Sequence, residues 1–244
     1  MTALSTGPMA IGRPRSTLVR LVKAVLLVLL LLLLLPYLLT PLYLFARPVS
    51  TLMLWRWATG ARVERIYVSV DTVAPALPLA VLVAEDARYC IHGGVDFAAM
   101  RDAIDEADEI SQMRGGSTIA QQTAKNLFLW PGRSVVRKAL ELPLALWLDF
   151  VLGKRRLMEI YLNIAEWGPG GEFGVEAGAR RAFGKSAREL STREAALLAA
   201  VLPNPHRRSA ARPGPGVRRL GGIYETRSRS SAAVADCIRR QTRP

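Results

Sequence analysis

The pattern of apolar and polar residues begins with one long apolar stretch near the N-terminus. Residues 24–46 contain no charged side chain, and about 20 apolar residues let a helix cross the hydrocarbon core of a bilayer. The stretch is longer than the apolar core of a cleaved signal peptide, and no clear small-x-small cleavage site follows it. It therefore predicts an uncleaved signal anchor, and Pro36 and Pro41 within it are compatible with a membrane helix.

Most of the remaining chain is typical of helices, because apolar residues recur at helical spacing and alternating runs are almost absent. Residues 47–75 are interpreted as a juxtamembrane connector with one short strand between residues 63 and 70. Gly and Pro turns separate the expected helices, which are 77–85, 97–110, 119–129, 135–152, 157–167, 175–183 and 195–202. Ser191 and Glu194 form a capping-box sequence before the last of them. The expected fold class is mainly α.

After residue 202 the helical periodicity is lost, and Pro, Gly and Ser become frequent. This composition favours a basic, loosely structured tail over residues 207–244, with one short helix over 232–238. The alternative is a tail that folds back on the domain or lies along anionic lipid headgroups.

The net charge of +13 is concentrated at the two ends of the chain. Residues 1–46 contain four basic and no acidic side chains, and residues 203–244 contain ten Arg and two acidic side chains, whereas the middle is nearly neutral. A binding face for nucleic acid is therefore not expected. The basic residues before the apolar stretch predict a cytoplasmic segment over 1–23 and a domain on the other side of the membrane.

The length of 244 residues, with only two cysteines, excludes a disulfide-built miniprotein and predicts one sizeable folded domain. Cys90 and Cys237 could pair in an oxidising compartment. Two cysteines so far apart in sequence are more often free thiols than a bridge, so the sequence assigns them no role.

The first candidate site follows the apolar run 77–84. Burial of Glu85 against apolar residues would raise the pKa of its carboxyl into the range where it can accept a proton from a sugar hydroxyl. Alternatively, Glu85 and Asp86 pair with Arg88 and His92 and simply close a turn.

Two further segments combine polar and charged residues on helices. Thr118, Gln122 and Lys125 form a stripe near an expected helix start, where anions are favoured, although a solvent-facing stripe is the alternative. Arg137, Lys138 and Glu141 share one face of a helix that continues into apolar residues. Such a polar cluster is costly to bury unless it serves a site.

These segments together resemble the monofunctional biosynthetic peptidoglycan transglycosylases, which are related to the glycosyltransferase domain of class A penicillin-binding proteins. The four family motifs are matched in order by EDARYCIHGGVD, GGSTIAQQTAKN, RKALE and KRRLMEIYLN. The resemblance covers about residues 65–206. It implies a lysozyme-like helical domain over 76–206 with a small membrane-proximal lobe, and polymerisation of lipid II into glycan strands with release of undecaprenyl diphosphate.

The resemblance also implies roles for individual residues. Glu85 is expected to be the general base that deprotonates the 4-hydroxyl of the acceptor sugar. Glu141 is expected to be the second carboxylate, which assists departure of the diphosphate or holds the cations of the site. The expected substrate-binding residues are Asp86, Tyr89, His92, Ser117, Thr118, Gln121, Gln122, Lys125, Asn126, Arg137, Lys138 and Lys154. No metal ligand is assigned; Mg²⁺ or Mn²⁺ is optional and would bind through the diphosphate and the carboxylates.

Three positions depart from the family pattern. Tyr89 stands where Phe is usual, Pro143 lies inside the helix that carries Glu141, and the tail after Pro205 differs from the usual C-terminal helix. The alternatives to a polymerase are an enzyme that cleaves glycan strands with paired carboxyls and a membrane-anchored scaffold with a degenerate site. The cations favour a diphosphate substrate and therefore the polymerase.

The resemblance further implies a location and partners. The expected location is the bacterial inner membrane, with a single span and a periplasmic catalytic domain. The expected partners are lipid II, the growing glycan strand, the membrane, and cell-wall synthesis or division proteins. A transpeptidase domain is not expected after residue 206.

Overall fold

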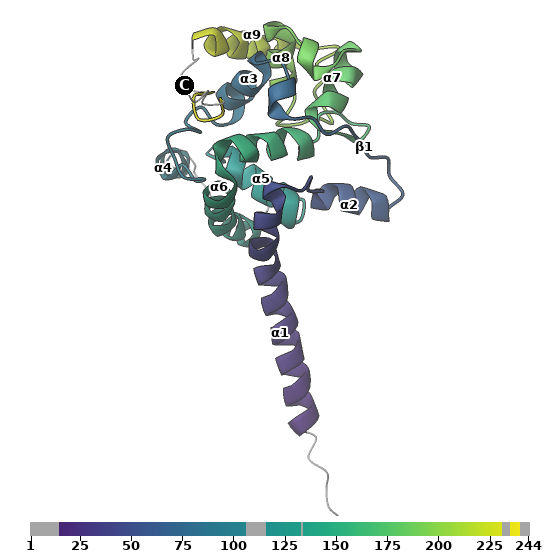
Figure 1. Ribbon diagram of the computed structural model, residues 1–244, viewed down its shortest axis with the longest axis vertical. Helices are drawn as coiled ribbons and strands as arrows, with labels where there is room; N and C mark the ends of the chain where they lie inside the picture. The colour runs from purple at the N-terminus through teal and green to yellow at the C-terminus, as the bar shows by residue number, and fades with distance from the viewer. Residues whose placement is uncertain (1–14, 106–115, 133, 231–234, 240–244) are drawn as a thin grey trace, which may run out of the picture.

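The computed structural model describes residues 15–105, 116–132, 134–230 and 235–239. Its N-terminal helix α1 (Arg15–Leu39) projects away from the rest of the chain and leads into the short helix η1 (Thr40–Leu44) (Figure 1). Within the described residues, Thr17–Leu44 is the only segment long and apolar enough to cross a membrane. The structure is therefore consistent with the predicted single membrane anchor.

The domain beyond the anchor is built almost entirely from helices, which confirms the mainly α class. Its strands β1 (Glu64–Arg65) and β2 (Glu172–Phe173) pair in parallel, and β1 lies inside the range expected for a short strand. Its helices are α2 (Thr51–Ala58), η2 (Val70–Thr72), α3 (Ala76–Glu85), α4 (Phe97–Asp105), α5 (Ile119–Phe128), α6 (Val135–Ile164), α7 (Val175–Phe183), η4 (Ala187–Glu189), α8 (Thr192–Ala199) and α9 (Pro215–Ser230).

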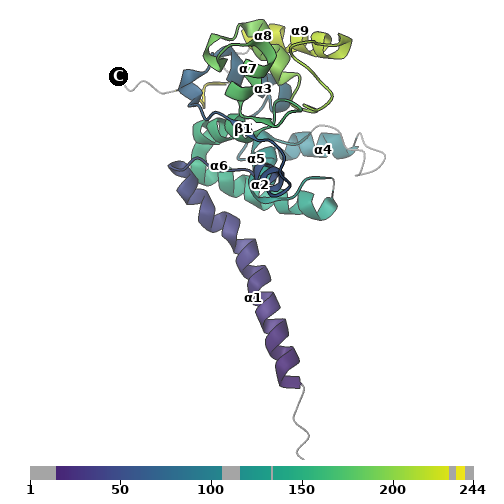
Figure 2. The same cartoon turned by 90° about the vertical axis from the view of Figure 1, so that its right-hand side faces the viewer.

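The helices form two groups that meet at α6. On the side of the membrane anchor, α5 packs along α6 and contacts α2, whereas α3, α8 and α9 pack together on the far side (Figures 1 and 2). Fully buried side chains join the groups in one core, among them Leu82 of α3, Ile119 of α5 and Leu148 of α6. Burial of such apolar surface is the main force that holds the helices together.

Helix α6 consists of two helical parts joined at Gly153. The φ angle of Gly153 is 68°, a left-handed value that glycine adopts without the steric cost of a Cβ. The sequence predicted two helices on either side of this residue, and the break confirms that boundary. Pro143 lies inside the first part, so the departure from helical geometry in α6 occurs at the glycine and not at the proline.

The other predicted helices agree with the structure to different degrees. The expected helix 175–183 coincides with α7, and Ser191 and Glu194 form the predicted capping box at the start of α8. The capping box therefore predicts the start of α8 correctly, whereas the helix ends at Ala199, before the predicted end at residue 202. The last part of the helix expected over 97–110 lies outside the described residues.

The prediction of a loosely structured tail is wrong for residues 215–230. These residues form α9, which packs on α8 and α3. The close approach depends on Gly221, because a Cβ there would lie 2.8 Å from Cδ2 of Leu197. A helix that packs through glycine and small side chains shows little apolar periodicity in its sequence. The hydrophobic pattern therefore did not predict α9. The short helix expected over 232–238 lies partly outside the described residues.

The expectation of two free thiols is also wrong. Cys90 and Cys237 form a disulfide, with their Cα atoms 5.6 Å apart. The return of the C-terminal segment onto the domain brings the two cysteines together, and this long-range contact has no local sequence signal.

Candidate active site

Glu85 is the last residue of α3 and lies at the centre of the predicted site. The side-chain amide of Gln122 donates a hydrogen bond of 2.7 Å to Oε2 of Glu85. The other oxygen, Oε1, is buried and has no hydrogen-bond partner among the described residues. Burial raises the pKa of Glu85, and the hydrogen bond from Gln122 and the charge of Lys125 oppose this rise. This carboxylate is therefore suited to accept a proton.

Helix α5 supplies the polar residues that face Glu85. Gln122 and Lys125 lie one turn apart, and the hydroxyl of Tyr161 donates to Oε1 of Gln122 at 3.1 Å, which fixes the orientation of the amide. Burial lowers the pKa of Lys125, the charge of Arg137 lowers it further, and the charge of Glu85 raises it. A half-buried cation whose charge acts on Glu85 is chemically suited to bind an anionic group.

The predicted cluster at the start of α6 is present. Arg137 donates a hydrogen bond to Oε1 of Glu141, and Nζ of Lys138 lies 3.2 Å from Oε2 of the same carboxylate. Lys138 also donates to the hydroxyl of Ser117 at 2.7 Å. Burial lowers the pKa of Lys138 to about 8, assisted by the charges of Arg137 and Lys125. Both oxygens of Glu141 are thus engaged by cationic side chains.

A cavity of about 210 Å³ lies beside the polar side chains of α5. Gln122, Lys125 and Asn126 of α5 and Tyr161 of α6 line it on one side, and residues from the segment after α8, such as His206, line it on the other. The cavity thus places the α5 side chains within reach of a bound molecule.

Glu166 is a cavity residue to which the sequence analysis gave no role. Its carboxylate accepts a hydrogen bond of 2.9 Å from Arg56 of α2 and lies 3.1 Å from Nε2 of His206. It therefore ties the membrane-proximal helix α2 to the segment after α8. The available sequence signal is an acidic side chain two residues after the buried end of α6 at Ile164.

The C-terminal part of the chain brings two more residues near Glu85. The charge of Arg208 lowers the pKa of Glu85, and the charge of Glu85 adds to the rise that burial causes in the pKa of Tyr224. Arg208 is held by a hydrogen bond of 2.8 Å to the carbonyl of Ala200. Both residues lie in the range 207–244 that the sequence predicts to be a loosely structured tail.

Some residues predicted to bind substrate are used inside the protein. Thr118 and Gln121 form a capping box at the start of α5, and Thr118 donates to the carbonyl of Gly94 at 2.6 Å. Asp86 lies 2.8 Å from Nε2 of His92, as the turn-closing alternative predicted, whereas Arg88 pairs with Asp96.

Tyr89 and Lys154 likewise contact the protein. Tyr89 is fully buried and donates to the carbonyl of Lys154 at 2.8 Å, and Lys154 forms an ion pair of 2.7 Å with Asp149. Of the predicted site residues, Gln122, Lys125 and Asn126 line the cavity described above; the others do not, namely Glu85, Asp86, Tyr89, His92, Ser117, Thr118, Gln121, Arg137, Lys138, Glu141 and Lys154. Their proposed contact with substrate stays a prediction.

Comparison with known proteins gives a consistent result. The family model described as Transglycosylase matches residues 53–221, a range wider at both ends than the sequence resemblance. A protein of Rhodopseudomonas palustris is 61% identical over 220 residues, which cover 90% of this chain and 93% of that protein. A protein of Nitrobacter winogradskyi is 59% identical, covering 87% of this chain and 94% of that protein.

A third relative, from Rhizobium johnstonii, is 53% identical over 221 residues, which cover 90% of each chain. All three relatives carry the name biosynthetic peptidoglycan transglycosylase. The match of the family model extends over more than half of the chain and includes the residues around Glu85. The chain therefore belongs to the Transglycosylase family and is a glycosyltransferase.

Proposed function

We propose that this glycosyltransferase polymerises lipid II into the glycan strands of peptidoglycan, with release of undecaprenyl diphosphate, in cell-wall biogenesis. The names of the relatives support the substrate class. The observation that carries the proposal is Glu85, which has one buried oxygen without a hydrogen-bond partner among the described residues and whose pKa is lowered by the charge of the half-buried Lys125. A base next to an anion-binding cation is what transfer of a sugar from a diphosphate requires.

The proposed reaction uses the charges on both sides of the bond that breaks. Glu85 accepts the proton of the acceptor 4-hydroxyl. At the same time the oxygen of that hydroxyl forms a bond to the anomeric carbon of the donor sugar. The bond from that carbon to the diphosphate oxygen breaks, and the leaving diphosphate gains negative charge. Lys125, Arg137 and Lys138 stabilise this charge because the fold holds them in place before the reaction.

The state of Glu141 argues against a strand-cleaving enzyme. Glycoside hydrolysis needs a second carboxyl that acts as acid, base or nucleophile. Both oxygens of Glu141 are occupied by Arg137 and Lys138, so this carboxylate is poorly available for such a role. It is well placed to hold the two cations near a diphosphate.

A metal ion held by the protein itself is not part of the proposed mechanism. The described residues contain no group of three or more His, Cys, Asp or Glu side chains that could hold one. Glu141 is already neutralised by side-chain cations. We propose that Mg²⁺ or Mn²⁺ is optional and enters only with the diphosphate of the substrate.

The proposed location is the inner membrane, with the N-terminus in the cytoplasm and the catalytic domain in the periplasm. The four basic residues before the anchor support this orientation. The disulfide between Cys90 and Cys237 supports it independently, because disulfides persist in oxidising compartments such as the periplasm.

The test is incubation of the detergent-solubilised full-length protein with labelled lipid II, followed by separation of the products by size. We expect glycan strands from the wild type and almost none from Glu85→Gln. A wild-type protein that shortens preformed strands but does not extend lipid II would replace the polymerase with a hydrolase.

A further inference from the structure

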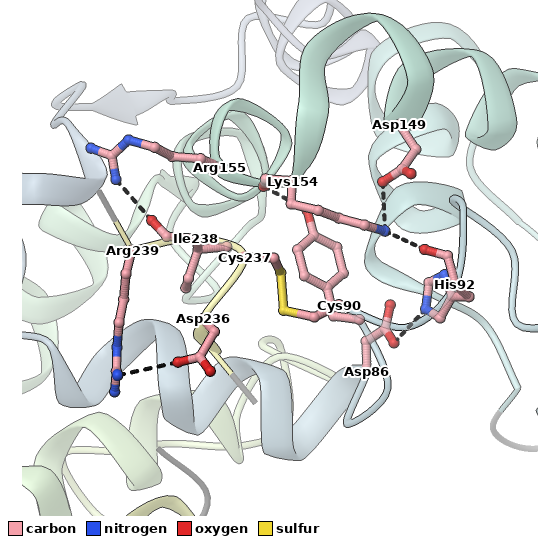
Figure 3. Close-up of a disulfide and its surroundings, with 11 residues drawn as sticks. Asp86, Cys90, His92, Asp149, Lys154, Arg155, Asp236, Cys237, Ile238 and Arg239 are labelled. Atoms are coloured by element: carbon pink, nitrogen blue, oxygen red, sulfur yellow. Dashed lines mark hydrogen bonds and ion pairs between the residues drawn. A yellow bond between two sulfur atoms is a disulfide. The ribbon is translucent and has the colours of Figure 1, made fainter. Parts of the chain in front are cut away.

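The C-terminal segment of the described chain is covalently attached beside the catalytic region. Cys237 is bonded to Cys90, which lies in the loop that follows Glu85 (Figure 3). Ala235 and Ile238 on either side of Cys237 are only 3% and 6% exposed. Residues 235–239, named here the C-terminal strap, are therefore seated on the domain and not merely tethered to it.

A second contact holds the strap to α6. Arg155 donates a hydrogen bond of 2.9 Å to the carbonyl of Ile238, and its guanidinium also pairs with Asp71. Arg155 follows Gly153, where α6 changes direction. The strap therefore spans from the bend of α6 to the loop at Cys90, as Figure 3 shows.

The loop to which the strap is bonded is fixed to the same bend. Tyr89 donates to the carbonyl of Lys154 at 2.8 Å, and Nζ of Lys154 donates to the carbonyl of His92 at 2.6 Å. The ammonium also lies 4.6 Å from the centre of the Tyr89 ring and 2.7 Å from Asp149. In the sequence, Cys90 thus lies between Tyr89 and His92, and both of these residues contact Lys154.

From this loop the contacts lead directly to the site. His92 lies 2.8 Å from Oδ1 of Asp86, and Oδ2 of Asp86 accepts a hydrogen bond of 3.0 Å from the backbone N–H of Ile119. Asp86 follows Glu85, and Ile119 begins the helix that carries Gln122. The position of the loop therefore affects how Glu85 and Gln122 face each other.

We propose that the Cys90–Cys237 disulfide is a positioning element for Glu85, so that the glycosyltransferase is fully active only when the strap is bonded to the loop. This inference rests on the proposed function. The bond forms by exchange with the disulfide of a protein thiol oxidase or of a small molecule. The two thiols give up two protons and two electrons, and the partner disulfide takes them up and becomes two thiols.

The expected effect of breaking the bond is local. The strap contributes only Ala235 and Ile238 to the core that contains Leu82, Ile119 and Leu148, so we expect the domain to stay folded. A displacement of Glu85 by about 1 Å is enough to lower the rate about 100-fold when it disturbs the geometry of attack. We therefore expect a decrease in kcat of about 10- to 100-fold on reduction, with a smaller change in KM.

The test compares the oxidised and the reduced wild-type protein with labelled lipid II, with the thiols counted by titration. Reduction is expected to lower kcat and to shift the acidic limb of its pH profile to lower pH, because a looser loop admits water and relieves the burial that raises the pKa of Glu85. Reoxidation is expected to restore both. The matched control is Cys90→Ser/Cys237→Ser, whose low activity should not respond to the reductant.

Hydrogen exchange of the two redox forms provides a readout that needs no activity. Reduction is expected to accelerate hydrogen exchange in residues 86–94 and at the start of α5. Exchange in α6 away from the bend at Gly153 is expected to stay unchanged. A fully reduced protein with unchanged kcat, pH profile and exchange would overturn the inference. Loss of activity in proportion to global unfolding would overturn it as well. Absence of strands from the oxidised protein would instead refute the proposed function, and the exchange experiment would still decide the role of the strap.

Discussion

Replacement of Glu85 by Gln removes the proposed base with little change in shape. The Gln side chain has nearly the same volume, and its carbonyl oxygen can still accept the hydrogen bond that Gln122 donates at 2.7 Å. The change therefore removes a charge and a proton acceptor and leaves the packing at the end of α3 intact. General-base catalysis contributes about 10²- to 10⁴-fold to a rate, which corresponds to about 3–5 kcal/mol of activation free energy.

The assay measures initial rates of strand formation from labelled lipid II and resolves kcat from KM. We expect Glu85→Gln to lower kcat by at least about 100-fold and to change KM little, because Lys125, Arg137 and Lys138 still bind the diphosphate. Glu189→Gln is the matched control, since Glu189 is exposed on η4 and its backbone contact with Ser186 survives the change. A kcat for Glu85→Gln within about threefold of wild type would refute the assignment of the base.

Three further predictions concern the cations and the cavity. Lys125→Ala should weaken binding of a diphosphate-lipid analogue about tenfold, the order expected for a lost charged hydrogen bond, as measured by calorimetry. The pKa of Lys138 is lowered to about 8, so its positive charge is present below that pH and lost above it; polymerisation should decline as pH rises through 8, and Lys138→Arg should move this decline to higher pH. Glu166→Gln should raise KM more than it lowers kcat, because it weakens the link between Arg56 and His206; an unchanged KM would show that the link does not shape the cavity.

Local sequence patterns predicted the parts of the site that lie within one helix. Arg137, Lys138 and Glu141 are neighbours on any helix that contains them, because residues three and four apart share a face. The structure confirms that cluster and its burial. The capping box at Ser191 is equally local. Such features depend on backbone geometry and therefore can be inferred without the tertiary fold.

The features that the sequence did not predict are contacts between distant segments. Glu166 contacts Arg56 and His206, which belong to two other parts of the chain. Cys90 is bonded to Cys237 although 147 positions separate them in the sequence. Hydrophobic periodicity specifies which face of a helix is buried but not which element covers it. Residues chosen by motif position, such as Lys154, were consequently expected at the substrate although their side chains contact the protein.

The membrane anchor is docked on the helices that carry the site. The indole N–H of Trp147 on α6 donates to the carbonyl of Tyr37 at 3.2 Å, and Arg156 donates to the carbonyl of Tyr43 at 2.8 Å. The ring of Tyr43 stacks on Phe128 at the end of α5, with 5.9 Å between the ring centres. The end of the anchor is thus attached to α5 and α6 at several points.

This attachment determines where the cations lie relative to the bilayer. Lys125 is on α5 and Arg137 and Lys138 are on α6, so their height above the end of the anchor is set by packed helices and not by a flexible linker. Exposed Trp55 and Trp57 of α2 lie in the same lobe, and Trp side chains favour the membrane interface. A diphosphate linked to a lipid is confined to that interface. In the proposed reaction the fold thus brings the cations to the substrate at a fixed depth, and Glu85, at the end of α3 and facing Gln122 of α5, defines the direction from which the acceptor sugar approaches.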